Sequence, residues 1–208
     1  MRKTLTVVAA TLMASSPWHT FAASSVDLTV TGLITPSACT PGLSGGGVVD
    51  HGKISAKDLS ATDQTLLPAS TLQMVVNCDA QTLFALKGIE NSVGSTNPNG
   101  FGLGLINGNQ PLGHYTLELL NASADTAAAT TLKSVDDGKT WDAMGGDVWS
   151  TLNLASFGNQ SGGNWAPIPI KDLTADLKVS TLIAPASGLD LTNEVPIDGS
   201  ATLEVKYL

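Results

Sequence analysis

The sequence predicts an all-β protein, built as a sandwich or barrel of antiparallel strands. Short segments of alternating apolar and polar residues recur along the chain, and this period of two is typical of strands with one buried face. Turn signals separate the segments, and the 208 residues include 21 glycines and 10 prolines. The length suits one domain that follows a short leader.

Residues 1–22 carry the features of a Sec-type signal peptide. Arg2 and Lys3 give a positive start, and the run from Leu5 to Ala14 is apolar but too short to span a membrane. The small residues that follow suit cleavage after Ala22 or one residue later. No second long apolar run is present, so we expect an exported chain without an integral membrane segment.

Residues 23–36 form an extension whose apolar side chains share one face of a strand. That face carries Val26, Leu28, Val30, Gly32 and Ile34, while mainly threonines and one aspartate occupy the other face. We interpret the extension as a strand that completes a sheet in a neighbouring molecule. The alternative is an ordinary first strand that pairs within its own domain.

The two cysteines, Cys39 and Cys78, predict one disulfide, because an even pair in an exported protein is usually oxidised. The bond would close a loop worth about 4 kcal/mol in the chain-entropy model. A metal or redox site is the alternative, but the chain has no CxxC spacing.

The remaining elements follow in chain order. Residues 48–55 form a short strand with a glycine break, and residues 55–59 form a helical turn with Ser55 as its cap. Strands follow at 66–78 and 82–89, the second with Phe84 and Leu86 toward the core. Residues 102–106 and 115–119 form a hairpin around the Asn107–Gly108 turn signal. The stretch 145–166 is predicted to be a long loop or insertion, and strands follow at 178–184 and 201–208.

Charge excludes several classes of partner. Without the leader the chain keeps 8 lysines against 18 acidic residues, a net charge near −10, and no arginine. Nucleic acid and anionic membrane surfaces are poor partners for such a chain. Sites that clamp a carboxylate or phosphate with two parallel hydrogen bonds commonly use arginine, which the exported chain lacks.

Several stretches, taken together and in order, resemble the chaperone–usher pilins. GLITPSAC (32–39), VVDHGKIS (48–55), LQMVVNC (72–78) and LFALKG (83–88) are similar to the N-terminal half of a pilin. The last strand, ATLEVKYL, is similar to the C-terminal pilin strand, with Leu203 and Val205 alternating toward the penultimate Tyr207. More closely, the chain resembles uncharacterised proteobacterial fimbrial-like secreted proteins, over the first seventy or so exported residues and the last ten.

The resemblance implies an immunoglobulin-like, pilin-type β-sandwich over residues 37–208 that lacks one strand. A donor strand would complete it, first from a periplasmic pilus chaperone and then, at an outer-membrane usher, from the 23–36 extension of another pilin subunit. The polymer could contain one kind of subunit or several. Val26, Leu28, Val30 and Ile34 would fill pockets, Gly32 would cross a shallow part of the groove, and the chaperone would grip Leu203, Val205 and Tyr207. We therefore expect a structural, non-enzymatic subunit of a surface fimbria that contributes to attachment and needs no cofactor.

Residues Ser134 to Trp141, SVDDGKTW, match the Asp-box of sialidase-type propellers. A propeller repeats this box in each blade, whereas it occurs once here, and sialidases hold their substrate with arginines. Asp136 and Asp137 lack the spacing of a calcium loop. We interpret the box as a structural turn with its tryptophan packed beneath, and retain glycan chemistry and calcium binding as the alternatives.

Other candidate residues point to weaker hypotheses. His51 and His114 are the only histidines beyond the leader, and neither has a second ligand or acid at a spacing typical of metal or acid–base sites. We predict no metal site and no catalytic residues. Trp149, Phe157 and Trp165 could stack on a sugar or pack under their loop. A self-contained, lectin-like secreted binding protein is therefore the alternative function.

Overall fold

The computed structural model describes residues 28–31 and 38–208. Residues 35–208 form one compact unit, separate from residues 1–34. Of the extension only 28–31 is described, without regular secondary structure, and Leu28 and Val30 are 88% and 86% exposed. The signal peptide and Val26, Gly32 and Ile34 lie outside the described residues.

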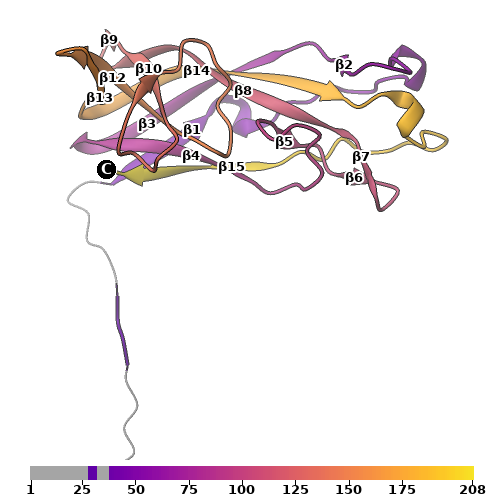
Figure 1. The fold of residues 1–208 in the computed structure, drawn as a ribbon, viewed down its shortest axis with the longest axis horizontal. Helices are drawn as coiled ribbons and strands as arrows, with labels where there is room; N and C mark the ends of the chain where they lie inside the picture. Colours follow the sequence, from indigo (N-terminus) through magenta and orange to yellow (C-terminus); the bar gives the residue numbers. More distant parts are fainter. Residues whose placement is uncertain (1–27, 32–37) are drawn as a thin grey trace, which may run out of the picture. The chain divides into compact units, whose positions relative to one another are not determined.

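Residues 38–208 form an all-β, sandwich-like fold of antiparallel sheets, with three short 3-10 turns and no α-helix among the described residues (Figure 1). The first sheet has the order β1 (Cys39–Leu43), β3 (Ser70–Thr82), β14 (Ile170–Ile183), β8 (Gly113–Ala124) and β5 (Phe101–Gly102). β2 (Thr65–Leu66) pairs with β14, and β9 (Ala127–Ala128) pairs with β8.

The second sheet has the order β11 (Asp142–Ala143), β10 (Thr130–Ser134), β12 (Leu154–Ser161), β4 (Phe84–Glu90) and β15 (Ala201–Tyr207). β13 (Asn164–Pro167) pairs with β12, and β6 (Leu105–Ile106) pairs with β7 (Gln110–Pro111) in a separate hairpin. The 3-10 turns are η1 (Ser44–Gly47), η2 (Ala56–Asp58) and η3 (Ala186–Gly188). β1 and β15 are therefore both edge strands, one in each sheet.

The core lies between the inner faces of the two sheets. Along β14 every second residue from Leu173 to Ile183 is buried, which is the alternation of a strand with one face inward. The residues from Leu173 to Val179 share one apolar cluster with β3, β8, β4 and β12, whereas Ile183 belongs to a second cluster with Leu67, Leu103, Ile106 and Leu112. The predicted core residues of β4 are confirmed, because Phe84 and Leu86 are 2% and 0% exposed.

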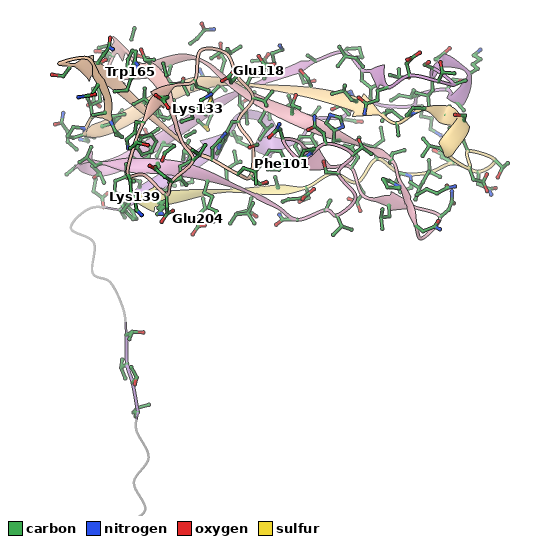
Figure 2. The ribbon with its side chains drawn as sticks, in the orientation of Figure 1. Phe101, Glu118, Lys133, Lys139, Trp165 and Glu204 are labelled. Atoms are coloured by element: carbon green, nitrogen blue, oxygen red, sulfur yellow. A yellow bond between two sulfur atoms is a disulfide. The ribbon has the colours of Figure 1, made fainter. Side chains whose placement is uncertain are left out.

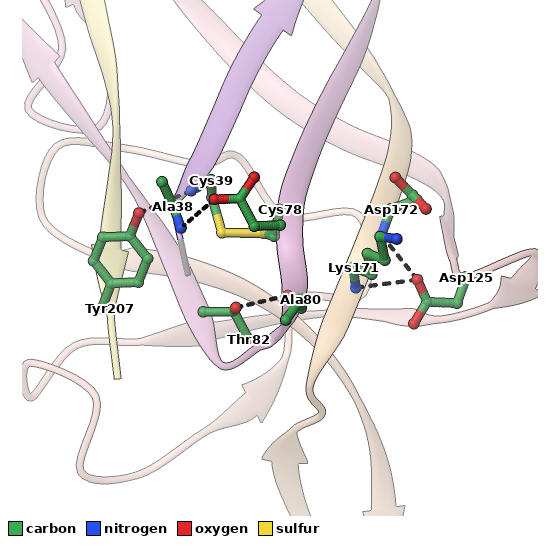
Figure 3. Close-up of a disulfide and its surroundings, with 10 residues drawn as sticks. Ala38, Cys39, Cys78, Ala80, Thr82, Asp125, Lys171, Asp172 and Tyr207 are labelled. Carbon is green, nitrogen blue, oxygen red and sulfur yellow. Dashed lines mark hydrogen bonds between the residues drawn. A yellow bond between two sulfur atoms is a disulfide. The ribbon is translucent and has the colours of Figure 1, made fainter. Parts of the chain in front are cut away.

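The predicted disulfide between Cys39 and Cys78 is confirmed. The two cysteines stand opposite each other in the register of β1 and β3. The bond therefore ties the first described strand of the domain to its neighbour, which is a central strand of the sheet (Figure 3).

Local predictions had mixed outcomes. Asn107 and Gly108 have positive φ angles of 51° and 87° and turn β6 into β7, as a type I′ turn requires. The hairpin predicted from residues 102–106 and 115–119 is shorter in the structure, where only β6 and β7 form it. β8 pairs with β5 and β14 instead. The helical turn η2 is present, but Ser55 makes no capping hydrogen bond through its side chain. The prediction of a long loop was wrong for much of 145–166, which contains β12 and part of β13.

Candidate functional site

The candidate site lies where the edge strands of the two sheets run side by side. Cys39 of β1 is next to Tyr207 of β15, and farther along Val49 and Ala201 line the same hollow. The chain after β1 and the chain up to β15 therefore run in opposite directions. They are close together at the Cys39–Tyr207 end and separate toward the other end (Figure 1).

Two adjoining hollows occupy the space between these segments, and we call them together the edge groove. The inner hollow has a volume of about 220 Å³ and the outer hollow about 550 Å³. Val49, His51 and Ile197 line both, so the hollows are continuous. Residues 49–59 form one wall, residues 191–203 form the other, and the groove widens toward the outer hollow.

The floor of the groove is the apolar inner face of the first sheet. Leu177, Val179, Thr181 and Ile183 follow one another along β14 beneath both hollows. Leu72 of β3 and Leu117 of β8 flank them in the inner hollow, and Leu112 joins them in the outer hollow. Most of these floor side chains are already buried, so an extended apolar chain laid in the groove would remove from water mainly the half-buried side chains of Val49, Leu72 and Leu203.

The β15 wall presents unpaired backbone groups to the groove. β15 pairs with β4 in a register in which Ser200 accepts a hydrogen bond from Asn91 and Leu208 donates one to Leu83. Bonding directions alternate along an antiparallel strand, so the N–H and C=O groups of Ala201, Leu203 and Val205 point away from β4. These groups have no strand partner among the described residues.

The opposite wall is also unpaired. Within residues 38–208, the backbone N–H groups of Val49, Asp50, His51, Lys53 and Ile54 donate no hydrogen bond, and that of Gly52 bonds only to the Asp50 side chain. Backbone groups without partners on both walls, above an apolar floor, suit the insertion of one more extended strand.

β1 itself offers less to an incoming strand. In the register with β3, the Asp79 N–H donates to the Ala38 carbonyl. The backbone N–H and C=O groups of Cys39, Pro41 and Leu43 therefore point away from β3, toward the open edge. Pro41 has no N–H to donate. The Cys39 N–H donates to the Tyr207 hydroxyl at 2.9 Å (Figure 3). The groove is therefore closed at this end, beside the disulfide.

Polar side chains line mainly the outer hollow, where they are Asp50, His51, Lys53, Thr192, Asn193 and Glu194. His51 reaches the floor and shares a hydrogen bond of 2.9 Å with the Thr181 hydroxyl. Lys53 and Glu194 form an ion pair of 3.3 Å between the two walls, but their side chains are 89% and 82% exposed. Such an exposed pair stabilises little, so it does not hold the walls together.

The Asp-box residues form a self-contained turn. The Asp136 carboxylate accepts hydrogen bonds from the Ser134 hydroxyl, from both the hydroxyl and N–H of Thr140, and from the Lys139 N–H. These bonds, led by that from the Thr140 hydroxyl, lower the pKa of Asp136. Its lone pairs are engaged in shaping the turn.

The same turn contacts the C-terminal strand. Asp137 pairs with Lys206 of β15, and Gly138 lies close to the Leu208 side chain. Figure 2 labels Lys139 of the turn and Glu204 of β15. The box therefore fastens the turn after β10 to the strand that forms one wall of the groove.

The other predicted candidates are dispersed. Trp149 and Phe157 are fully buried in the core, although the Trp149 indole N–H has no partner among the described residues. Trp165 is half-buried on β13 (Figure 2), so the structure does not bring the three aromatic residues together on one surface. His114 is buried against Thr96 and Asn97, and burial lowers its pKa. In the part of the chain that the structure describes, no three acidic, histidine or cysteine residues are grouped to hold a metal.

The predicted C-terminal residues lie at the groove. Leu203 lines the inner hollow, Val205 packs on the core, and Tyr207 closes the end. Sequence reasoning missed the wall at 191–199 and the role of 49–54 as the facing wall. The alternation of Val195, Ile197, Gly199 and Ala201 was the available signal. No helix among the described residues has the length and apolar character needed to cross a membrane.

Three comparisons with known proteins bear on this site. A family model described as a protein of unknown function (DUF1120) matches residues 28–102, which includes part of the extension and one groove wall. The chain is 26% identical to the Uncharacterized protein YhcF of Escherichia coli (strain K12), over 88% of this chain and 90% of that protein. It is 25% identical to the Protein GltF of the same organism, over 88% of both chains.

Proposed function

We propose that this protein is a structural subunit of a chaperone–usher fimbria, and that subunits join by donating the 23–36 extension to the edge groove of the next subunit. The observation that carries the proposal is the groove itself. It combines an apolar floor with unpaired backbone on both walls, which is what a sandwich presents where one strand is missing. The fold would then be the immunoglobulin-like, pilin-type sandwich that the sequence resembles.

The extension has the length and pattern that the groove requires. Val26 to Ile34 provides five alternate positions, and Val195 to Leu203 provides five alternate positions along the wall that leads into β15. Side chains of a donor strand would point to the floor while its N–H and C=O groups bond to the walls. The match of the family model from Leu28 onward fits an extension that belongs with the sandwich.

The closed end of the groove dictates the direction of the donor strand. Only residues 35–37 separate Ile34 from Ala38 of the donor's own domain, a span of at most about 14 Å. That domain cannot lie at the end filled by Tyr207 and the disulfide, so it lies beyond the outer hollow. The donor strand then runs antiparallel to β15.

An unfilled groove exposes apolar surface and a free strand edge, both of which favour aggregation. A newly exported subunit therefore needs a temporary partner, and a periplasmic chaperone with an extended strand would serve. An outer-membrane usher would then bring the subunits together at the cell surface. The disulfide is consistent with an exported chain.

The lectin-like alternative has less support. It depended on Trp149, Phe157 and Trp165 as a platform, and the first two are fully buried.

Deletion of residues 24–35 tests the proposal. The full exported chain, co-expressed with a periplasmic pilus chaperone and an outer-membrane usher, should form a ladder of subunit complexes that stays intact in detergent gels run without heating. The deletion variant should still bind the chaperone, because its groove is intact, but should form no ladder. Unchanged assembly by the deletion variant would contradict the proposal, and a stable, monodisperse monomer without any chaperone would favour the self-contained alternative.

A further inference from the structure

We propose that Tyr207 is the end stop of the edge groove and fixes the register of the strand donated by a second copy of this chain. This inference rests on the function proposed above and adds a positioning residue and a pairing scheme. Leu203 is the last residue of β15 to line a hollow, and neither Val205 nor Tyr207 lines one. The groove thus ends along β15 between Leu203 and Tyr207.

The Tyr207 ring spans the gap between the two sheets. It projects from β15 in the second sheet, and its hydroxyl accepts the Cys39 N–H of β1 in the first sheet at 2.9 Å (Figure 3). Cys39 is held in turn by the disulfide and by the β3 ladder. A strand that continued along β15 past Leu203 would have to displace the ring and break this bond, so residues 23–25 would have to leave the groove at this end.

A fixed end selects one register out of several. With the strand antiparallel to β15 and five positions set against five, Val26 falls opposite Leu203 and Ile34 opposite Val195. Leu28 then falls opposite Ala201, Val30 opposite Gly199, and Gly32 opposite Ile197.

At its three middle positions this register places a larger residue against a smaller one. Gly199 adds no side chain to the groove, and a Cβ there would lie 3.0 Å from Tyr115 and Leu103, so Val30 would pack against those two side chains. Ile197 reaches into both hollows and leaves room only for Gly32. A shift by two residues would set Val30 against Ile197, or against Ala201 with Gly32 facing Gly199, and lose this fit.

Hydrogen exchange can read the register directly. The acceptor is the full exported chain with Leu28→Asp and Val30→Asp, so that it does not donate to other copies, and the probe is a synthetic peptide of residues 23–36. The peptide should slow exchange of the Ala201 and Leu203 amides at least about tenfold and leave the Tyr207 amide unchanged. The Thr202 and Glu204 amides already bond to β4 and serve as internal controls.

Variants at Tyr207 separate the ring from its hydroxyl. Tyr207→Ala should let the peptide advance, so that protection extends to the amide of residue 207. Tyr207→Phe keeps the ring and should retain the wild-type register while the Cys39 amide exchanges faster. The same protection map in Tyr207→Ala and in the wild type would overturn the end stop. No protection of Ala201 or Leu203 in the wild-type groove would instead refute strand donation itself.

A second measurement does not require Tyr207→Ala to fold. A Gly32→Val peptide should bind the wild-type groove at least about tenfold more weakly, and Ile197→Ala in the acceptor should restore most of that loss. Ile54→Ala, on the facing wall, is the matched control and should not restore it. Equal recovery with Ile197→Ala and Ile54→Ala, or no recovery with either, would overturn the register.

Discussion

Substitution of Leu28 by alanine in a donor peptide should weaken binding to the edge groove far more than substitution of its neighbour Thr29. Leu28 belongs to the apolar row of the extension, whereas Thr29 belongs to the opposite face. The groove floor beneath the apolar row consists of Leu177, Val179 and Ile183, each of which is less than 10% exposed. A leucine side chain that packs on this floor, between the two walls of the groove, would be removed from water almost completely.

The magnitude follows from the atoms removed. Leu28→Ala deletes three carbons, which at about 0.8 kcal/mol per buried carbon amounts to about 2.4 kcal/mol. Since about 1.4 kcal/mol corresponds to a factor of ten, the Kd of the peptide should rise about fifty-fold. Thr29→Ala removes no buried carbon and should change the Kd less than about three-fold.

Fluorescence anisotropy of a labelled peptide of residues 23–36 measures both values. The acceptor is the full exported chain with its own Leu28 and Val30 replaced by aspartate, so that it presents an empty groove. Competition with unlabelled variant peptides then gives the two Kd values side by side. Equal losses for Leu28→Ala and Thr29→Ala would refute the reasoning, because a strand in this groove cannot bury both faces.

Three further perturbations test the surroundings of the groove. Tyr207→Phe should lower the free energy of unfolding by about 1 kcal/mol, since it leaves the Cys39 N–H unpaired. The control is Tyr115→Phe, which should change this free energy little, because the Tyr115 hydroxyl has no hydrogen-bond partner among the described residues. Equal urea midpoints for the two variants would contradict this. Replacing Cys39 and Cys78 together by serine should cost about 4 kcal/mol of unfolding free energy, and a thermal unfolding curve like that of the wild type would contradict this. The pKa of Asp136 is lowered in the folded protein, so the ionised carboxylate stabilises the fold at neutral pH, and this stabilisation is lost as the pH falls below the ordinary carboxyl value of 3.8. Asp136→Asn should therefore make the unfolding free energy depend less on pH in the acid range. An unchanged acid dependence would contradict this.

The features that the sequence predicted correctly are those written in local patterns. The alternation of β3 and β4, the Asn107–Gly108 turn and the Asp-box turn each depend on residues close together in the chain. The disulfide was also predictable, because two cysteines in an exported chain leave one pairing.

The groove was harder to predict because distant and irregular segments form it. Residues 49–54 and 191–199 belong to no strand, and the alternation from Val195 to Ala201 is too short to mark the second segment as a groove wall. The 145–166 stretch misled for another reason. Its glycines and serines suggested a loop, but Phe157 is buried where β12 crosses the core, and Gly158 is required because a Cβ would meet the Ala166 carbonyl at 2.0 Å.

The protection of the sheet edges gives the strongest reason to regard the groove as functional. β5 and β11 are two residues long, and β13 ends at Pro167, so these edges offer little to another chain. β1 has Pro41 and the Tyr207 hydroxyl where two outward N–H groups would otherwise be free. β15 is seven residues long and contains no proline, and among the described residues the groups on its outer edge have no strand partner. Among the described residues the other edges are blunted and this one stays open above an apolar floor, which supports the proposal that the groove accepts a donated strand.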